Sequence, residues 1–330
     1  MPHIAVLSVA HIHSKDYCKK LAELVGGPFV IWDEDAERGR RYAQTYGCAF
    51  EPDLEAVLAD SSVDGFLVCA ENTRHLPLLR KVLPVGKPTF CEKPLATSGA
   101  EAAEAYALAH RYGTKLLLGY FRPFDGQNRA VKKLLADGVF GKVTHISFRN
   151  GHNAAYGRWF DSPDLQWFTQ PALSGGGALL DLGTHAVHLL RHLGGPVESV
   201  WANIVNCSGV YTDVDDYGLI LMKFASGVIG RVEAGWIFTG AGGAGLEIVG
   251  SEKSLWTTPE KGMQLGIRNE AVTVEPLDAR PDRVSRLLAA IEGRLTDEEI
   301  ESDLVCAMDA AKIMEAAYAS ARSGSWVDVH

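Results

Sequence analysis

Gly86-Lys87-Pro88-Thr89-Phe90-Cys91-Glu92-Lys93-Pro94 joins a short apolar run to a lysine that directly precedes a proline. The run Thr89–Cys91 is typical of a short buried strand. A residue before proline is disfavoured in the helical region and adopts an extended conformation. The sequence therefore predicts that the chain leaves a strand here and that the backbone holds Lys93 in a fixed direction.

The first 120 residues continue this pattern, because short apolar runs alternate with amphipathic stretches. Such alternation predicts a doubly wound parallel sheet covered by helices, since successive parallel strands need crossover connections. The expected strands are Ile4–Ser8, Phe29–Trp32, Gly65–Cys69, Thr89–Cys91 and Lys115–Gly119. The expected helices are Lys15–Val25, Asp35–Tyr46, Leu54–Ala59, His75–Leu83 and Gly99–Tyr112.

The pattern changes after Arg122, where a helix is expected over Asp125–Ala136 and strands follow from Lys142 onward. Turn signals between these strands indicate antiparallel hairpins. We therefore predict an α/β plus α+β fold, with one domain in residues 1–122 and a second in residues 123–330. The expected strands are Val143–Phe148, Val197–Asn206, Tyr217–Phe224, Gly227–Ala234, Gly245–Val249 and Ser254–Thr257, and the closing helices are Asp282–Glu292 and Asp303–Ser320.

Composition is that of a globular enzyme. The 330 residues exceed the usual size of one core, and hydrophobic residues make up 47% of them. A net charge of −9, without a basic cluster, argues against a general nucleic-acid binder. No signal peptide or membrane-spanning run is readable, and the six cysteines have no Cys-x-x-Cys spacing. We expect a cytoplasmic protein with reduced thiols and neither a nucleic-acid nor a membrane partner.

A second polar constellation lies in Gly175-Gly176-Gly177-Ala178-Leu179-Leu180-Asp181-Leu182-Gly183-Thr184-His185. If this segment is helical, Asp181 and His185 share one face, because residues four apart are neighbours on a helix. Together with Lys93 they can accept, donate or orient a proton near neutral pH. Taken alone, the pair is more typical of polar residues on a helix surface than of a catalytic pair.

The turn after the first expected strand is where a dinucleotide fold would bind pyrophosphate. Here the glycine fingerprint is replaced by Ser8-Val9-Ala10-His11-Ile12-His13. Ser8 and Ala10 are small enough for close approach, whereas His13 replaces the third glycine, so an ordinary strand-to-helix turn is an equal alternative. Asp33, after the second strand, is placed to bind ribose hydroxyls and to disfavour NADP, or to cap the next helix. We expect NAD, with NADP possible because Arg38, Arg40 and Arg41 follow closely.

Several motifs together resemble the glucose-fructose oxidoreductase, inositol dehydrogenase and rhizopine-catabolism (Gfo/Idh/MocA) family. They are Ala70-Glu71-Asn72-Thr73-Arg74-His75, Gly86-Lys87-Pro88, Cys91-Glu92-Lys93-Pro94-Leu95-Ala96, Gly119-Tyr120-Phe121-Arg122 and the Gly175–His185 segment. The resemblance implies an N-terminal Rossmann domain, a C-terminal domain with a large open sheet, and NAD(P)-dependent oxidation or reduction of sugars and cyclic polyols. It also implies cofactor contacts from Asn72, His75, Glu92 and Lys93, and a catalytic role for Lys93, Asp181 and His185. The glycine fingerprint is the one part that does not match the family. The cofactor contacts expected from Ser8, Ala10, His11 and Ile12 follow instead from the position of the turn after the first strand.

Oxidation of a secondary alcohol removes a hydride from carbon and a proton from oxygen. We expect His185 to be the general base, since its intrinsic pKa lies near neutrality, and Asp181 to orient the substrate or to tune the imidazole. Lys93 would hydrogen-bond the reacting oxygen and stabilise alkoxide character. Either Lys93 or His185 could hold the proton in the transition state.

Substrate contacts are expected from Arg122, Tyr156 and Trp159, because aromatic faces pack against sugar rings while polar groups fix the hydroxyls. The aromatic pair could equally pack a loop onto the sheet. No metal is expected. A site built from His11, His13, Asp181 and His185 is conceivable, but its spacing is not typical of metal ligands.

Three functions stay open at this point. The first is a dehydrogenase that exchanges its cofactor at each turnover. The second uses tightly held NAD transiently for epimerisation or elimination. The third is a binding protein for sugars or dinucleotides without turnover. A homodimer or homotetramer is expected, because a large sheet has an open face that must be covered.

Overall fold

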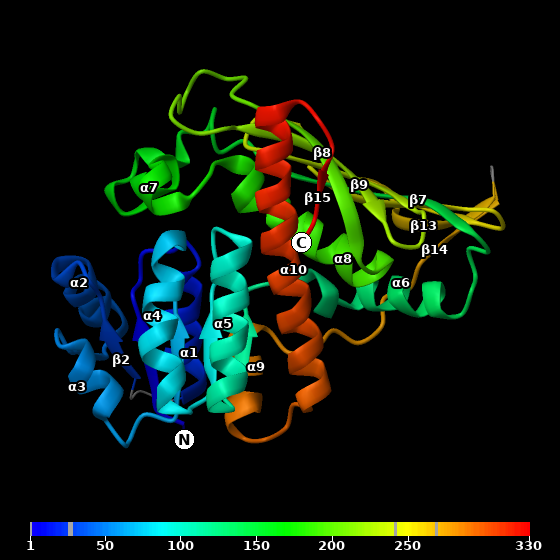
Figure 1. The fold of residues 1–330 in the computed structure, drawn as a ribbon. Coiled ribbons are helices and arrows are strands. Elements are labelled where there is room, and N and C mark those ends of the chain that lie inside the picture. The colour runs from blue at the N-terminus through cyan, green and yellow to red at the C-terminus, as the bar shows by residue number, and fades with distance from the viewer. Residues whose placement is uncertain (1, 26–28, 241–242, 268–269) are drawn as a thin grey trace.

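The computed structural model describes residues 2–25, 29–240, 243–267 and 270–330 and arranges them around two sheets (Figure 1). The first sheet has the order β3-β2-β1-β4-β5-β6, and all its strands are parallel. This is the predicted doubly wound arrangement. Its strands are β1 (Ile4–Leu7), β2 (Phe29–Trp32), β3 (Ala49–Phe50), β4 (Gly65–Val68), β5 (Thr89–Cys91) and β6 (Leu116–Leu118).

Both faces of this sheet are covered by helices, as expected for buried parallel strands. Successive residues of β1 alternate between the two faces: Ile4 and Val6 pack with helices α1, α2 and α9, whereas Ala5 and Leu7 pack with helices α3, α4, α5 and α10. The helices of the first 120 residues are α1 (Ser14–Val25), α2 (Ala36–Tyr46), α3 (Leu54–Ala59), α4 (His75–Val82) and α5 (Gly99–Tyr112). The closing helices are α9 (Arg283–Ile291) and α10 (Asp297–Ser323).

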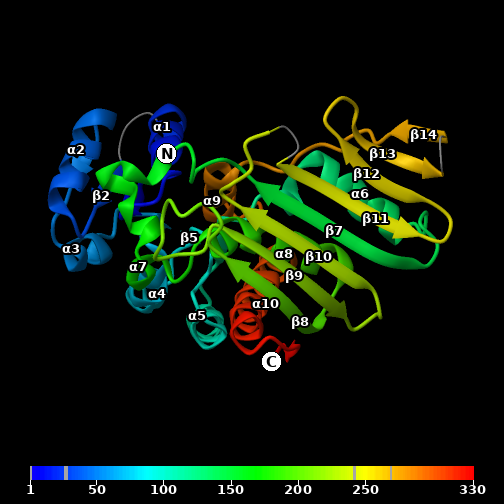
Figure 2. The ribbon, with the colours of Figure 1, turned by 90° about the horizontal axis from the view of Figure 1, so that it is seen from above.

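The second sheet has nine strands in the order β14-β13-β12-β11-β7-β10-β9-β8-β15 (Figure 2). Among the described strand pairs of this sheet, β7 and β10 are parallel and the others antiparallel. One face carries the largest core, with α6 (Gly126–Ala136), α8 (Thr184–Gly194) and α10 packed on it. The strands are β7 (Val143–Gly151), β8 (Val197–Val205), β9 (Tyr217–Phe224), β10 (Ile229–Gly235), β11 (Ala244–Gly250), β12 (Ser254–Thr258), β13 (Gly262–Ile267), β14 (Glu270–Thr273) and β15 (Val327–Asp328).

The sequence reading missed four strands, β3, β13, β14 and β15, and set the start of α10 too late. The strands β3 and β15 have two residues each, and β14 is exposed along its length, so none has a buried alternating pattern. Helix α10 begins at Asp297 rather than Asp303, because Thr296 and Glu299 form a capping box. The threonine and the glutamate three residues later are present in the sequence as a helix-start signal.

The last helix, α10, connects the two sheets. Leu304, Ala307 and Ala311 of α10 pack in the core of the first sheet, whereas Ala310, Ile313 and Met314 pack in that of the second. A division at residue 122 therefore separates the two sheets but not their supporting helices, and it stays a prediction. No helix in the described part of the chain combines the length and apolar character needed to cross a membrane.

The Gly175–His185 segment is not one regular helix, so the condition under which Asp181 and His185 would share a helix face is not met as stated. Leu179–Gly183 forms a π-helical turn, and α8 follows it. Asp215 holds the start of this turn, since its carboxylate accepts from the backbone N–H groups of Gly177 at 3.0 Å and Leu179 at 2.8 Å. A Cβ atom on Gly177 would lie 2.0 Å from the Asp215 carbonyl oxygen, so glycine is required there by space.

We expect Gly177→Ala to destabilise the protein by about 1–3 kcal/mol, the usual cost of overpacking, because backbone must move to admit the methyl group. Differential scanning calorimetry should show a lower melting temperature. Gly240→Ala is the matched control, because a Cβ atom there meets no neighbour within 4 Å. Equal melting temperatures for the two variants would contradict this account of the turn.

Candidate active site

A cavity of about 350 Å³ lies where the loops after β1 and β5 face the second domain. In a doubly wound sheet ligands bind at the carboxyl ends of the strands, and this cavity occupies that edge. The predicted residues Ile12, Lys93, Arg122, Trp159, Asp181 and His185 line it, together with His13, Asp16, Phe121, Asn150, His152, Phe160, Phe168 and Leu182. Tyr156 does not line it and is half exposed.

Lys93 and Asp181 form the central contact of the site. Lys93 Nζ donates to Asp181 Oδ1 at 2.7 Å and to the Asp181 carbonyl oxygen at 3.2 Å. Trp236 Nε1 donates to the other carboxylate oxygen at 3.0 Å. Burial works to raise the pKa of Asp181, but Lys93, His152 and the bond from Trp236 outweigh it and lower the pKa to about 2. Asp181 is therefore ionised at neutral pH.

His185 lies in the first turn of α8, next to this pair, but it donates no hydrogen bond to Asp181 in the described part of the site. Its ring meets Tyr120 edge to face at 5.7 Å, and its Nδ1 atom is buried without a partner. Burial lowers the pKa of His185 well below 6.5, and Lys93, Arg283, Arg122 and His13 lower it further. The imidazole is therefore neutral at pH 7 and able to accept a proton.

Tyr120 supports this histidine and was not identified as a site residue from the sequence. Its hydroxyl lies 2.7 Å from Thr184 Oγ1, and its ring stacks on His188 at 3.9 Å. Tyr120 thus contacts three residues of α8, namely Thr184, His185 and His188. In the sequence, only its place in the motif Gly119-Tyr120-Phe121-Arg122 pointed to Tyr120. No motif pointed to Trp236.

The turn between β1 and α1 keeps the backbone form that a glycine would give. Ser8 has φ +68°, a left-handed conformation that is rare for residues other than glycine. His11 Nε2 on this turn is buried without a hydrogen-bond partner, so a phosphate oxygen would find a donor there. Asp33 directly follows β2, at the position where a dinucleotide fold binds ribose. These features fit a dinucleotide despite the lost glycines.

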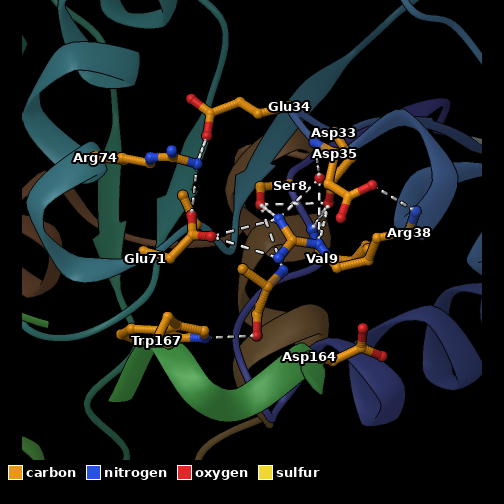
Figure 3. A network of polar contacts seen from close by, with 12 residues as sticks. Ser8, Val9, Asp33, Glu34, Asp35, Arg38, Glu71, Arg74, Asp164 and Trp167 are labelled. Atoms are coloured by element: carbon orange, nitrogen blue, oxygen red, sulfur yellow. Dashed lines mark hydrogen bonds and ion pairs between the residues drawn. The ribbon is translucent and has the colours of Figure 1, made fainter. Parts of the chain in front are cut away.

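Asp33 already has partners within the protein (Figure 3). Its carboxylate accepts from the backbone of Val9 and Asp35, at 2.7 and 2.8 Å. Arg38 Nη2 donates to Asp33 at 2.8 Å and its Nη1 lies 3.4 Å from Glu71. Ribose hydroxyls bound at Asp33 would therefore take the place of the Arg38 guanidinium.

A segment of the second domain packs against the first domain beside the turn between β1 and α1. Trp167 Nε1 donates to the Ala10 carbonyl oxygen at 3.0 Å, and Trp167 packs beside His11. Asn72 Nδ2 donates to the Ser174 carbonyl oxygen at 2.8 Å. Asp164 pairs with Arg41 of α2 at 2.6 Å. Residues 164–174 therefore connect the two domains and cover the turn between β1 and α1.

His75 and Glu92 are buried and partnered inside the protein. His75 Nδ1 lies 2.7 Å from the Pro94 carbonyl oxygen and Nε2 lies 3.1 Å from that of Ala70. Burial lowers the pKa of His75, so the neutral ring has one N–H and donates to one of these oxygens. Glu92 Oε1 meets the Tyr17 hydroxyl and His13 Nδ1, and its Oε2 accepts from the Lys93 N–H at 2.9 Å. Their contacts with a cofactor stay predictions, whereas their role in shaping the site is direct.

The conceivable metal site does not assemble as proposed. His11 and His13 come together with Glu92, not with Asp181 and His185, and the three offer ligand atoms within 4.8 Å of one another. Donors converge on Glu92 Oε1, however, and an Arg283 nitrogen lies 3.5 Å from His13 Nδ1. A hydrogen-bonded carboxylate explains this cluster without a cation.

Comparison with known proteins assigns the family. Residues 11–120 match an oxidoreductase family with an NAD-binding Rossmann fold, and residues 128–256 match the GFO/IDH/MocA C-terminal domain. The chain belongs to the Gfo/Idh/MocA family. The resemblance of the motifs is thereby confirmed, as are the two-sheet fold and NAD as the family's cofactor.

The relatives differ in the reactions that their names give. The chain is 28% identical over 222 residues to 2,7-anhydro-N-acetylneuraminate hydratase of Mediterraneibacter gnavus, a match that covers 64% of this chain and 56% of that protein. It is 26% identical over 237 residues to inositol 2-dehydrogenase of Rubrobacter xylanophilus, covering 71% and 64%. The chain thus spans only part of the length of these curated relatives.

Solved structures share the whole fold. GenD2 from gentamicin A biosynthesis, in complex with NAD, superposes with a TM-score of 0.79 at 25% identity, covering 100% of this chain and 96% of that one. Levoglucosan dehydrogenase, in complex with NADH and levoglucosan, gives 0.81 at 21% identity and covers 99% of both chains.

We expect Lys93→Gln to lower kcat/KM by about 10²–10⁴-fold, as for loss of a positioned acid–base group, measured by steady-state kinetics. The variant should also lose stability, because it leaves Asp181 buried without its cation. Adding Asp181→Asn should restore stability but not activity. Lys81→Gln is the control, since Lys81 pairs with Glu55 at 2.6 Å on the surface. Unchanged kcat/KM in Lys93→Gln would remove Lys93 from the chemistry.

The acid limb of the kcat/KM profile should lie below pH 6.5, because His185 must be unprotonated and its pKa is lowered below 6.5. Activity then falls only as pH falls through that lowered pKa. Stability should also fall below pH 6.5, where the unfolded chain binds a proton that folded His185 does not. Arg122→Gln, which removes one of the lowering charges, should move the limb upward. A limb at or above pH 6.5 would show that another group controls the rate.

Proposed function

We propose that this protein is an NAD-dependent oxidoreductase that transfers a hydride to or from a secondary alcohol of a sugar, cyclic polyol or related carbohydrate. The observation that carries the proposal is the Lys93–Asp181 ion pair beside a neutral His185 in one cavity. Names of relatives support it, because they include inositol 2-dehydrogenase and levoglucosan dehydrogenase.

A bound nicotinamide would supply the hydride acceptor or donor. The chain itself has to handle the proton. Neutral His185 would accept it from the substrate hydroxyl, because burial and the neighbouring cations keep the imidazole unprotonated. Lys93 would donate a hydrogen bond to the same oxygen and stabilise its developing negative charge.

Asp181 would act through Lys93 rather than through His185. Its carboxylate holds the ammonium group at 2.7 Å and is itself fixed by Trp236. A lysine restrained by its bonds to the carboxylate and the carbonyl oxygen of Asp181 has one donor left for the cavity. Arg122 and Trp159, which line the cavity, would contact the substrate, and Trp159 stacks on His152 at 4.5 Å. Of the three predicted substrate contacts, Tyr156 has the least support, because it does not line the cavity.

A second candidate is transient use of a retained NAD for epimerisation or elimination. Two observations favour this second candidate. One relative is named a hydratase. Residues 164–174 also connect the second domain to the first near the turn between β1 and α1. Trp167 bonds Ala10, Ser174 bonds Asn72, and Asp164 pairs with Arg41. Such a cover would slow exchange of a bound dinucleotide. The third alternative, a binding protein without turnover, has no observation of its own in its favour.

The oligomeric state and the compartment belong to the same proposal. We infer a homodimer or homotetramer, because helices α6, α8 and α10 lie on one face of the nine-stranded sheet and leave the other to be covered (Figure 2). We also infer that the protein acts in the cytoplasm on small molecules and binds neither nucleic acid nor membranes.

Calorimetric titration with NAD⁺ and NADP⁺ tests the cofactor step. We expect micromolar binding of NAD⁺ by cofactor-stripped protein, weaker binding of NADP⁺, and loss of NAD⁺ binding in Asp33→Ala, because Asp33 is the ribose acceptor at the end of β2. Asp60→Ala is a control, since Asp60 is an exposed acid at the end of α3. Absence of binding to either dinucleotide would overturn the proposal.

Turnover distinguishes the two reactions. A dehydrogenase accumulates free NADH when supplied with polyols and excess NAD⁺. An enzyme that uses NAD transiently converts its substrate without net NADH, and the dinucleotide remains with the protein through gel filtration. Trp167→Ala, which removes the contact with the Ala10 carbonyl oxygen, should hasten NADH release, measured by stopped-flow fluorescence.

A further inference from the structure

Arg122 lines the cavity, whereas Arg283 lines a second cavity that shares Asp16 and Phe121 with it. The guanidinium carbons of Arg122 and Arg283 lie 5.2 and 4.8 Å from the centre of the Phe121 ring, so both pack against one aromatic side chain. Within the described residues, no carboxylate lies within 4 Å of either guanidinium group. Arginines this close to a binding cavity usually pair with a carboxylate or phosphate.

Arg122 reaches into the cavity with part of its hydrogen-bonding capacity unused. Its Nη2 donates to Asn150 Oδ1 at 2.7 Å, which fixes the plane of the group, and its Nε is buried without a partner. Burial lowers the pKa of Arg122 to about 10, with Asp125 acting in the opposite direction. The group therefore stays charged at neutral pH while surrounded by little water.

Arg283, at the start of α9, is equally poorly satisfied. Its Nη1 lies 3.5 Å from His13 Nδ1, which in turn lies 2.9 Å from Glu92 Oε1. One ring nitrogen cannot donate to Glu92 and accept from Arg283 at once. The Nε and Nη2 atoms of Arg283 are buried and have no partner either. A smaller cavity, also lined by Phe121 and Asp16, adjoins this arginine.

The other charged groups around the cavity have partners of their own. Lys93 is paired with Asp181, and Glu92 accepts from the Tyr17 hydroxyl, bonds His13 and accepts from the Lys93 N–H. Asp16 lines both cavities but lies more than 4 Å from either guanidinium group. Within the described residues neither arginine therefore has a carboxylate in direct contact. A bound carboxylate would supply one.

We propose that the substrate carries a carboxylate, held by Arg122 and Arg283, so that the site acts on an acidic carbohydrate such as a uronic or aldonic acid. This inference rests on the proposed oxidoreductase function. The carboxylate would lie beside Phe121, and the reacting hydroxyl between Lys93 and His185. Two fixed guanidinium groups would therefore select both the charge of the substrate and the carbon that faces the catalytic groups.

Equilibrium binding to NAD⁺-loaded protein tests the proposal with matched probes. Calorimetry would compare D-glucuronate and D-gluconate with D-glucose and myo-inositol, and D-glucose 6-phosphate as the phosphate analogue. We expect the two carboxylates to bind at least tenfold more tightly than the neutral compounds, the scale of a hydrogen bond to a charged group. Their affinity should fall with added salt.

Arg283→Gln should weaken carboxylate binding by roughly 10–100-fold and leave neutral compounds unchanged, on the same scale for a charged hydrogen bond. Arg294→Gln is the control, because Arg294 is exposed just beyond the end of α9 and pairs with Glu292. Circular dichroism spectra and melting temperatures of both variants would exclude unfolding. Arg122→Gln provides the second arm, with the same expected loss of carboxylate binding.

The proposal is overturned if neutral polyols bind as well as the acids, if the phosphate ester binds best, or if no carboxylate binds at millimolar concentration. Equal affinity of Arg283→Gln and the unaltered protein for D-glucuronate would also overturn it. Each of these outcomes leaves NAD⁺ binding intact. Failure of the oxidoreductase proposal is recognised separately, because the protein then binds no dinucleotide at the first titration step.

Discussion

The ion pair between Lys93 and Asp181 is the constraint around which the site is organised. Its partners are 88 residues apart and come from different domains, one after β5 and the other from the π-helical turn before α8. Both side chains are largely withdrawn from water, so neither charge could remain there alone without a large cost. The pair therefore fixes how the second domain sits on the carboxyl edge of the first sheet, and it places the ammonium group in the cavity.

The surroundings of this pair explain the irregular helix. A regular helix would put Asp181 and His185 on one face. With the π-helical turn between them, the two side chains have different partners. Asp181 contacts Lys93 and Trp236, whereas His185 contacts Tyr120 and lines the cavity. The wider turn depends on Gly177, where backbone and Asp215 approach too closely for any side chain. Single-turn widenings of this kind are frequent at functional sites.

Most of the first domain could be read from the sequence, because buried parallel strands and their helices leave strong local patterns. Lys93 could be placed because the following proline restricts its backbone. What the sequence could not reveal were contacts between distant segments: Trp236 on Asp181, Trp167 on Ala10, and Arg283 beside Phe121. None of these has a local periodicity or a fixed spacing. The altered glycine turn was also ambiguous, since only the backbone angle of Ser8 shows that the turn is preserved.

The unpaired arginines and the histidine are linked by electrostatics. Arg122 and Arg283 are among the charges that lower the pKa of His185, after burial and Lys93. A negatively charged group bound between them would cancel part of this field, so the pKa of His185 would rise toward 6.5 on binding. A base with a pKa closer to the working pH is a stronger proton acceptor. The two arginines would then do more than hold an acidic substrate: its charge would strengthen the base that acts on it, whereas a neutral polyol would leave His185 weakly basic.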